Sequence, residues 1–132
     1  MKPVKTKKIS NPADIITISS NALNIAKKIG FSETEAYSIS IAVSELASNI
    51  HKYAKNGYIH INIIKEKNRN GLEVIATDNG PGIKNIPDAM RDNYSTSDGL
   101  GIGLPGVKRL MDEFEIKSEP DNGTYINTKK WL

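Results

Sequence analysis

The sequence predicts a two-layer α/β sandwich of the α+β kind, in which three helices cover one face of a mixed, mostly antiparallel sheet. Three observations favour this fold class. Two long segments near the N-terminus repeat apolar residues with helical spacing, two later pairs of segments alternate as strands do, and a helical segment separates those pairs. Helices and strands that each bury one apolar face are expected to pack as two layers around one core.

The first half of the chain is expected to hold one strand and two helices. Residues 4–9 alternate loosely and predict a short edge strand. The first helix begins at Pro12, which suits a first helical turn, and closes at Gly30. The second helix opens with the capping-box pattern SETE at 32–35 and ends at the Asn-Gly pair 56–57.

A hairpin is predicted to follow the second helix. Residues 58–66 and 72–77 alternate apolar and polar side chains, and both runs are therefore strands. The pair Asn70-Gly71 between them is typical of a tight hairpin turn, and we place the turn there.

The second half of the chain contains a long irregular segment before its last elements. Residues 80–101 show no periodicity beyond one turn of helix near 87–91, and a segment of this length inside a compact domain is usually a functional loop or lid. Residues 104–114 predict a third helix, and 114–119 and 124–132 predict two final strands.

Composition limits the classes of function. The 132 residues, 38% of them hydrophobic, are expected to form a single domain over 1–132. The chain has no cysteine, which excludes disulfides and thiolate metal sites. It has no run of eighteen apolar residues and no apolar segment behind its first lysines, so we expect a cytoplasmic protein that does not enter a membrane. The net charge of +3 is spread along the chain, and nucleic-acid binding is not expected.

Glycines 101, 103 and 106 spell the pattern G-x-G-x-x-G, which occurs in dinucleotide-binding sites. A dinucleotide fingerprint must leave a buried strand directly and open a helix, whereas here a polar, irregular segment precedes the glycines. No Gly-Lys-Ser/Thr follows them, so a Walker loop is also absent. The pattern therefore belongs to some other kind of glycine loop.

Two short stretches could carry chemistry. Glu45 and Asn49 lie four residues apart on one helix face, where an amide oxygen can assist Mg²⁺ and a carboxylate can take a hydroxyl proton; a solvated helix edge is the alternative. Asp78 ends a strand and is followed by Gly80 and Gly82. Its carboxylate could accept a hydrogen bond from an exocyclic amine while the glycines permit close approach, although a plain tight turn would use the same residues.

Two further stretches contain glycines. A glycine loop leads into the third helix, and the free N–H groups of that helix N-terminus form a natural anion site; a flexible linker is the alternative. The pair Gly123-Thr124 places a hydroxyl next to a glycine, as ordinary turns also do. The glycines of the loop are Gly99, Gly101, Gly103 and Gly106.

Taken in order, these four stretches resemble the N, G1, G2 and G3 boxes of the Bergerat ATP-binding fold, the GHKL superfamily of gyrase, heat-shock chaperone, histidine kinase and mismatch-repair ATPases. The chain is too short for the gyrase or chaperone branches. Through SELASNI, DNGPGI and YSTSDGLGIGLPGVKRLMDEF it is most similar to the anti-sigma-factor serine kinases, and among them to the stressosome switch kinases.

The resemblance implies roles for individual residues. Asp78 would bind the adenine amine of ATP or ADP, with Thr124 supporting the base through water, and Asn49 would hold Mg²⁺. Glu45 would be the general base for a serine or threonine hydroxyl. The ATP lid would span about 85–101, with Tyr94, Ser95 and Thr96 at its hinge. The remaining nucleotide contacts would be Lys52, Gly80, Gly82, Ile83, Gly99, Leu100, Gly101, Ile102, Gly103 and Leu104.

The resemblance also implies partners. The expected function is a serine/threonine protein kinase that phosphorylates a STAS-domain scaffold or antagonist in a partner-switching stress pathway, and that binds and activates a PP2C-type phosphatase. A homodimer is left open. The alternatives are a nucleotide-gated binding switch with little catalysis and a detached histidine-kinase ATPase domain. His51 is not expected to be a phospho-acceptor, because it lies on the helix that would bind ATP.

Overall fold

The computed structural model of the chain describes residues 3–83, 86–90 and 103–132. None of the helices in these ranges has both the length and the apolar character needed to cross a membrane. The elements, in chain order, are β1 (Lys5–Ile9), α1 (Pro12–Ile29), α2 (Glu33–Asn49), the π-helical turn η1 (Ile50–Ala54), β2 (Gly57–Glu66), β3 (Arg69–Asp78), α3 (Ile86–Ala89), α4 (Gly103–Leu110), β4 (Glu113–Ser118) and β5 (Thr124–Trp131).

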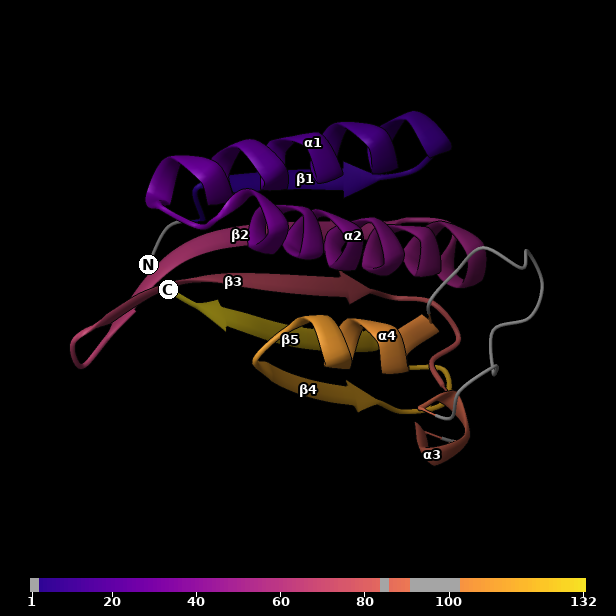
Figure 1. Cartoon of the computed structure of the whole chain (residues 1–132). Coiled ribbons are helices and arrows are strands. Elements are labelled where there is room, and N and C mark those ends of the chain that lie inside the picture. Colours follow the sequence, from indigo (N-terminus) through magenta and orange to yellow (C-terminus); the bar gives the residue numbers. More distant parts are fainter. Residues whose placement is uncertain (1–2, 84–85, 91–102) are drawn as a thin grey trace.

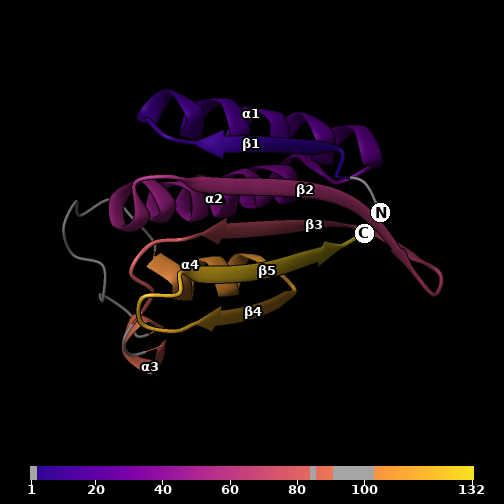
Figure 2. The same cartoon turned by 180° about the vertical axis from the view of Figure 1, so that it is seen from behind.

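The five strands form one sheet in the order β1-β2-β3-β5-β4. Helices α1, α2 and α4 cover one face of it (Figure 1), and the view from behind has the strands in front (Figure 2). The predicted two-layer sandwich with three helices on one face is confirmed. The sheet differs from the mixed sheet expected, because every neighbouring pair of these described strands is antiparallel. β3 and β4 run parallel to each other, but they do not pair, because β5 lies between them in the sheet.

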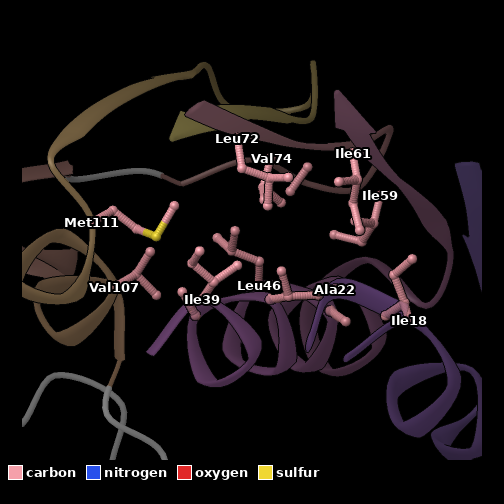
Figure 3. Close-up of a cluster of buried hydrophobic side chains, with 14 of the residues drawn as sticks. Ile18, Ala22, Ile39, Leu46, Ile59, Ile61, Leu72, Val74, Val107 and Met111 are labelled. Carbon is pink, nitrogen blue, oxygen red and sulfur yellow. The ribbon is translucent and has the colours of Figure 1, made fainter. Parts of the chain in front are cut away.

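The core lies between the helical layer and the sheet. Alternate residues of β2 and β3 point toward the helices, as the two-residue period of a strand requires. They meet side chains of α1, α2 and α4 in one dry cluster (Figure 3), which stabilises the fold by removing apolar surface from water. The labelled members of this cluster are Ile18, Ala22, Ile39, Leu46, Ile59, Ile61, Leu72, Val74, Val107 and Met111.

The helix starts agree with the sequence patterns. Asn11 caps α1, and the capping box that it forms with Asp14 satisfies backbone N–H groups at both positions. The Oγ atom of Ser32 accepts a 3.1 Å hydrogen bond from the backbone N–H of Glu35 at the start of α2. Gly30 ends α1 with φ +114°, in the left-handed region where a C-terminal cap favours glycine.

The second helix ends differently from the prediction. Its α-helical part stops at Asn49, residues 50–54 form the wider π-helical turn η1, and Lys55 leaves with φ +72°. Turns of this kind change the angular spacing of side chains and are frequent at functional sites. The continuous helix expected to the pair 56–57 therefore changes its geometry at Asn49, a residue that the sequence marks as a candidate ligand.

The hairpin turn lies three residues earlier than predicted. β2 and β3 pair from Gly57–Asp78 to Glu66–Arg69, so the turn is formed by residues 67 and 68, with Lys67 at φ +55°. The predicted turn residue Gly71 lies inside β3 and pairs with Ile64. A Cβ atom there would lie 2.6 Å from the carbonyl oxygen of Lys130 and 2.7 Å from the ring of Trp131. Close packing against Trp131, not turn geometry, explains the glycine.

Replacing Gly71 by alanine should therefore destabilise the protein. The added methyl group must displace the Trp131 ring, and overpacking of this kind costs about 1–3 kcal/mol of the free energy of unfolding. Urea unfolding followed by the fluorescence of the single tryptophan measures the loss. The exposed neighbour Asn70 gives the matched control, because Asn70→Ala should change stability by less than about 0.5 kcal/mol. Equal stabilities of the two variants would contradict the packing explanation.

The third helix is also shorter than the predicted range 104–114. α4 ends at Leu110, whose carbonyl oxygen accepts a 3.0 Å hydrogen bond from the Nζ atom of Lys130. The backbone N–H of Asp112 then donates to Lys129, and β4 begins at Glu113. Residues 112–114, which were predicted to be helical, therefore bond to β5 and do not continue α4. The turn of helix expected near 87–91 is found as α3, and residues 85 and 91–101 of the predicted lid lie outside the described ranges.

Candidate functional site

A cleft of about 530 Å³ opens at the end of the sheet where β3 and β5 meet the helical layer. Its walls come from α2, η1, the loop after β3, the start of α4 and the turn between β4 and β5. The walls are largely apolar, with a few polar groups among them, as small-molecule sites usually are. The lining residues are Leu46, Asn49, Ile50, Tyr53, Ala54, Ala76, Asp78, Pro81, Gly82, Ile83, Gly103, Leu104, Pro120, Asp121, Thr124 and Ile126.

Asp78 is the last residue of β3 and faces Thr124, the first residue of β5. The Oδ1 atom of Asp78 accepts a 2.9 Å hydrogen bond from the backbone N–H of Gly80. Burial raises the pKa of the Asp78 carboxyl above its ordinary 3.8, and the backbone N–H groups of Gly80 and Thr124 oppose that rise. The protein thus holds a half-buried hydrogen-bond acceptor against an apolar cleft.

Gly82 lets the loop after β3 pack tightly on the turn that precedes β5. Its φ is +77°, and a Cβ atom there would lie 2.1 Å from the carbonyl oxygen of Glu119. Two hydrogen bonds hold the same contact: the backbone N–H of Ile83 donates to Ser118 Oγ at 2.7 Å, and that of Asp121 donates to the Pro81 carbonyl at 2.7 Å. This wall of the cleft is therefore fixed in place before any ligand enters.

The opposite wall carries the candidate residues of α2 and η1. Asn49 lines the cleft at the point where α2 gives way to η1. Glu45 lies one helical turn before it and is buried, with 8% of its surface exposed. The Nζ atom of Lys52 lies 5.6 Å from the centre of the Tyr53 ring. The Nδ1 atom of His51 is buried and has no hydrogen-bond partner among the described residues.

The structure thus gathers most of the predicted site residues that it describes. Those that line the cleft are Asn49, Asp78, Gly82, Ile83, Gly103, Leu104 and Thr124. Those that do not line it are Glu45, Lys52 and Gly80. Those outside the described residues are Ser95, Thr96, Gly99, Leu100, Gly101 and Ile102.

Several lining residues were not identified from the sequence. Leu46 and Ile50 fit the apolar stripe of a helix, and the same stripe also forms the floor of the cleft. Tyr53 ends that stripe in the sequence but is half exposed in the structure, and nothing in the sequence distinguished it from a core position. Ser118, which holds the cleft wall at Ile83 without lining the cleft, also gave no signal, because a serine at a strand end is common.

The cleft fits a nucleotide. Apolar walls suit the faces of a base, and the Asp78 carboxylate suits an exocyclic amine. The N-terminus of α4, at Gly103, provides backbone N–H groups for an anion. In the described part of the chain, no group of three or more His, Asp or Glu side chains could hold a metal ion. A Mg²⁺ ion at Asn49 would therefore depend on phosphate and water oxygens for its other ligands.

Comparisons with known proteins agree with this geometry. Residues 9–130 match the model of the histidine kinase-like ATPase domain family. The chain is 48% identical over 119 residues to the serine/threonine-protein kinase RsbT of Bacillus subtilis (strain 168), covering 90% of each chain. It is 36% identical over 104 residues to the anti-sigma F factor of Thermoanaerobacter sp. (strain X514), covering 74% of this chain and 71% of that one.

Two solved structures share the fold at low sequence identity. One is from the crystal structure of the SiaB-SiaC complex of Pseudomonas aeruginosa, with a TM-score of 0.63 and 14% identity over 99% of this chain and 91% of that one. The other is the mycobacterial sensor histidine kinase MprB, with a TM-score of 0.56 and 15% identity over 96% of each chain.

Proposed function

This chain belongs to the histidine kinase-like ATPase domain family and is an ATP-binding serine/threonine-protein kinase, and from this premise we propose its substrate, its metal ion and the residues that act. The substrate is a STAS-domain regulator in a partner-switching stress pathway, phosphorylated on serine or threonine with Mg-ATP. The kinase also binds and activates a PP2C-type phosphatase. All of these activities belong to one domain.

The observation that carries the proposal is the convergence of four distant segments on one cleft. Asn49 from α2, Asp78 from β3, Gly103 from α4 and Thr124 from β5 all line it. Each residue type matches a part of Mg-ATP: an amide oxygen for the metal, a carboxylate for the amine, a helix N-terminus for phosphate and a hydroxyl near the base. Because phosphoryl transfer depends mainly on positioning and electrostatics, this set of groups is suited to it.

In the proposed binding mode, the adenine ring lies between the apolar walls and donates its amine to Asp78. Gly82 keeps the loop after β3 close to the turn before β5, so the end of the cleft keeps its shape. Asn49 offers its amide oxygen to Mg²⁺, which neutralises phosphate charge when bound. The backbone N–H groups at the start of α4 hold the phosphate chain.

In the proposed transfer step, Glu45 accepts the proton of the partner's serine or threonine hydroxyl. The hydroxyl oxygen forms a bond to the γ-phosphorus as the bond from that phosphorus to the bridging oxygen of ADP breaks. Glu45 lies on the same helix as Asn49, four residues earlier, and its backbone is therefore held rigidly relative to the phosphate end of the cleft. Its side chain is largely buried, which limits its contact with bulk water.

The relatives support the proposed partners. A serine/threonine-protein kinase and an anti-sigma factor both match most of the chain, and both kinds of protein act on other proteins. The anti-sigma match also favours the second candidate function, a nucleotide-gated binding switch in which protein contact matters more than transfer.

Transfer from γ-labelled ATP with Mg²⁺ to a STAS-domain protein encoded near this gene tests the proposal. We expect label on serine or threonine, stable in acid, and none when Mg²⁺ is chelated. ATP binding together with tight binding of the STAS protein but no label would favour the binding switch. Acid-labile label would indicate transfer to histidine and would contradict the proposal.

A further inference from the structure

Ser118, the last residue of β4, lies behind the end of the cleft and does not line it. Its Oγ atom takes part in three hydrogen bonds. It accepts from the backbone N–H of Ile83 at 2.7 Å and donates to the carbonyl oxygen of Gly123 at 3.0 Å. It also shares a 2.8 Å hydrogen bond with Thr124 Oγ1.

The direction of the Ser118–Thr124 hydrogen bond follows from counting protons. A serine hydroxyl has one proton and two lone pairs. A carbonyl oxygen cannot donate, so the single proton of Ser118 goes to Gly123. One lone pair accepts from Ile83, and the other must accept the hydroxyl proton of Thr124. All three positions on the Ser118 oxygen are then occupied.

This arrangement fixes what Thr124 can offer to a ligand. Its only hydroxyl proton is directed at Ser118, away from the cleft, so toward the cleft Thr124 Oγ1 can only accept. The neighbouring Asp78 carboxylate also accepts. The end of the cleft therefore presents two adjacent hydrogen-bond acceptors and lacks a hydroxyl donor from either of these two side chains.

From this geometry we infer that Ser118 is a positioning residue for base selection: it orients the Thr124 hydroxyl so that the cleft selects purines with an amino group at position 6 over purines with an oxo group there. The inference rests on the proposed ATP site and deepens it. An amino group supplies the two donors that two acceptors require, whereas an oxo group would meet them with its own lone pairs. Sites that leave such groups unpaired discriminate strongly.

The test compares binding of ATP, purine riboside 5′-triphosphate and ITP, which carry an amino group, a hydrogen and an oxo group at position 6. Wild type should bind them in that order of decreasing affinity. In Ser118→Ala the Thr124 proton is free to turn into the cleft and donate to an oxo group. The ATP-to-ITP affinity ratio should then fall by about tenfold, which corresponds to one net hydrogen bond.

A ratio is the informative readout because Ser118 also holds the loop at Ile83. Loss of that contact alone would weaken all three nucleotides equally and leave the ratio unchanged, and this result would overturn the inference. Ser118→Thr keeps the hydroxyl and should restore the ratio. In a Thr124→Val background, where the hydroxyl is absent, Ser118→Ala should change the ratio no further; a second tenfold fall there would also overturn it.

The inference and the proposed function fail in different ways. If Ser118→Ala does not fold, the pair Thr124→Val and Thr124→Ser decides: the valine variant should lower the ATP-to-ITP affinity ratio by about tenfold, with Asp78 keeping part of the preference, and the serine variant should keep the wild-type ratio. Wild type that binds ATP and ITP equally would overturn the inference while ATP binding stands. Wild type that binds none of the three nucleotides would overturn the ATP site itself.

Discussion

Glu45→Gln should reduce phosphoryl transfer by about 10²–10⁴-fold while ATP binding stays within about threefold of wild type. The amide has nearly the shape of the carboxylate but cannot accept the hydroxyl proton. Because Glu45 does not line the cleft, the bound nucleotide should lose little by the change. Single-turnover transfer to the STAS substrate and a separate measurement of the ATP dissociation constant give the two values.

The matched control for this prediction is Glu33→Gln. Glu33 lies in the first turn of the same helix and is exposed, so its loss should leave transfer unchanged. If Glu45→Gln transfers phosphate at the wild-type rate, Glu45 is not the base. If Glu45→Gln loses ATP binding as well as transfer, the buried Glu45 side chain supports the structure of the site and does not act as the base.

Asp78→Asn should weaken ATP binding by about 10- to 100-fold, the effect expected when a hydrogen bond to a charged acceptor is lost. The amide keeps one oxygen for the backbone N–H of Gly80 but brings an NH₂ group that faces the amine of adenine. Isothermal titration of wild type and variant measures the difference. Unchanged affinity would remove Asp78 from the nucleotide site.

The same substitution should not destabilise the protein at neutral pH. Burial raises the pKa of Asp78, so between its ordinary value of 3.8 and the raised value the native state binds more protons than the unfolded state. The free energy of unfolding therefore falls as the pH rises through this window. Above the raised pKa, the protein carries the whole cost of burying the ionised carboxylate. Asp78→Asn removes this cost, and its unfolding free energy should match or exceed that of wild type at pH 7.

A second carboxylate on the cleft gives the matched control for the measurement of ATP affinity. Asp121 also lines the cleft, but the hydrogen bond it makes to Pro81 comes from its backbone N–H, which Asp121→Asn retains. Its φ of +67° suits asparagine as well as aspartate. Asp121→Asn should therefore change ATP affinity by less than about threefold, and a loss as large as that of Asp78→Asn would indicate a general charge effect.

The fold class, most of the elements and the principal candidate residues could be predicted from local patterns in the chain. Periodicity identified α1, α2 and the strand pairs, because each buries one face and must repeat apolar residues at its own spacing. The glutamate, asparagine, aspartate and glycines in four ordered motifs indicated a nucleotide site before any contact was known. These patterns involve residues that are close together in the chain, so they can be recognised without knowledge of the tertiary contacts.

The features that depend on residues far apart in the chain could not be predicted in this way. The turn residue expected at Gly71 proved to be a strand residue packed on Trp131, which follows sixty residues later. β5 shortened α4 by taking the carbonyl of Leu110 and the backbone N–H of Asp112 into hydrogen bonds. The role proposed for Ser118 arises from three partners on two other segments, and no pattern within β4 encodes them. Such features are fixed by packing and by hydrogen-bond satisfaction between elements, which one stretch of sequence does not contain.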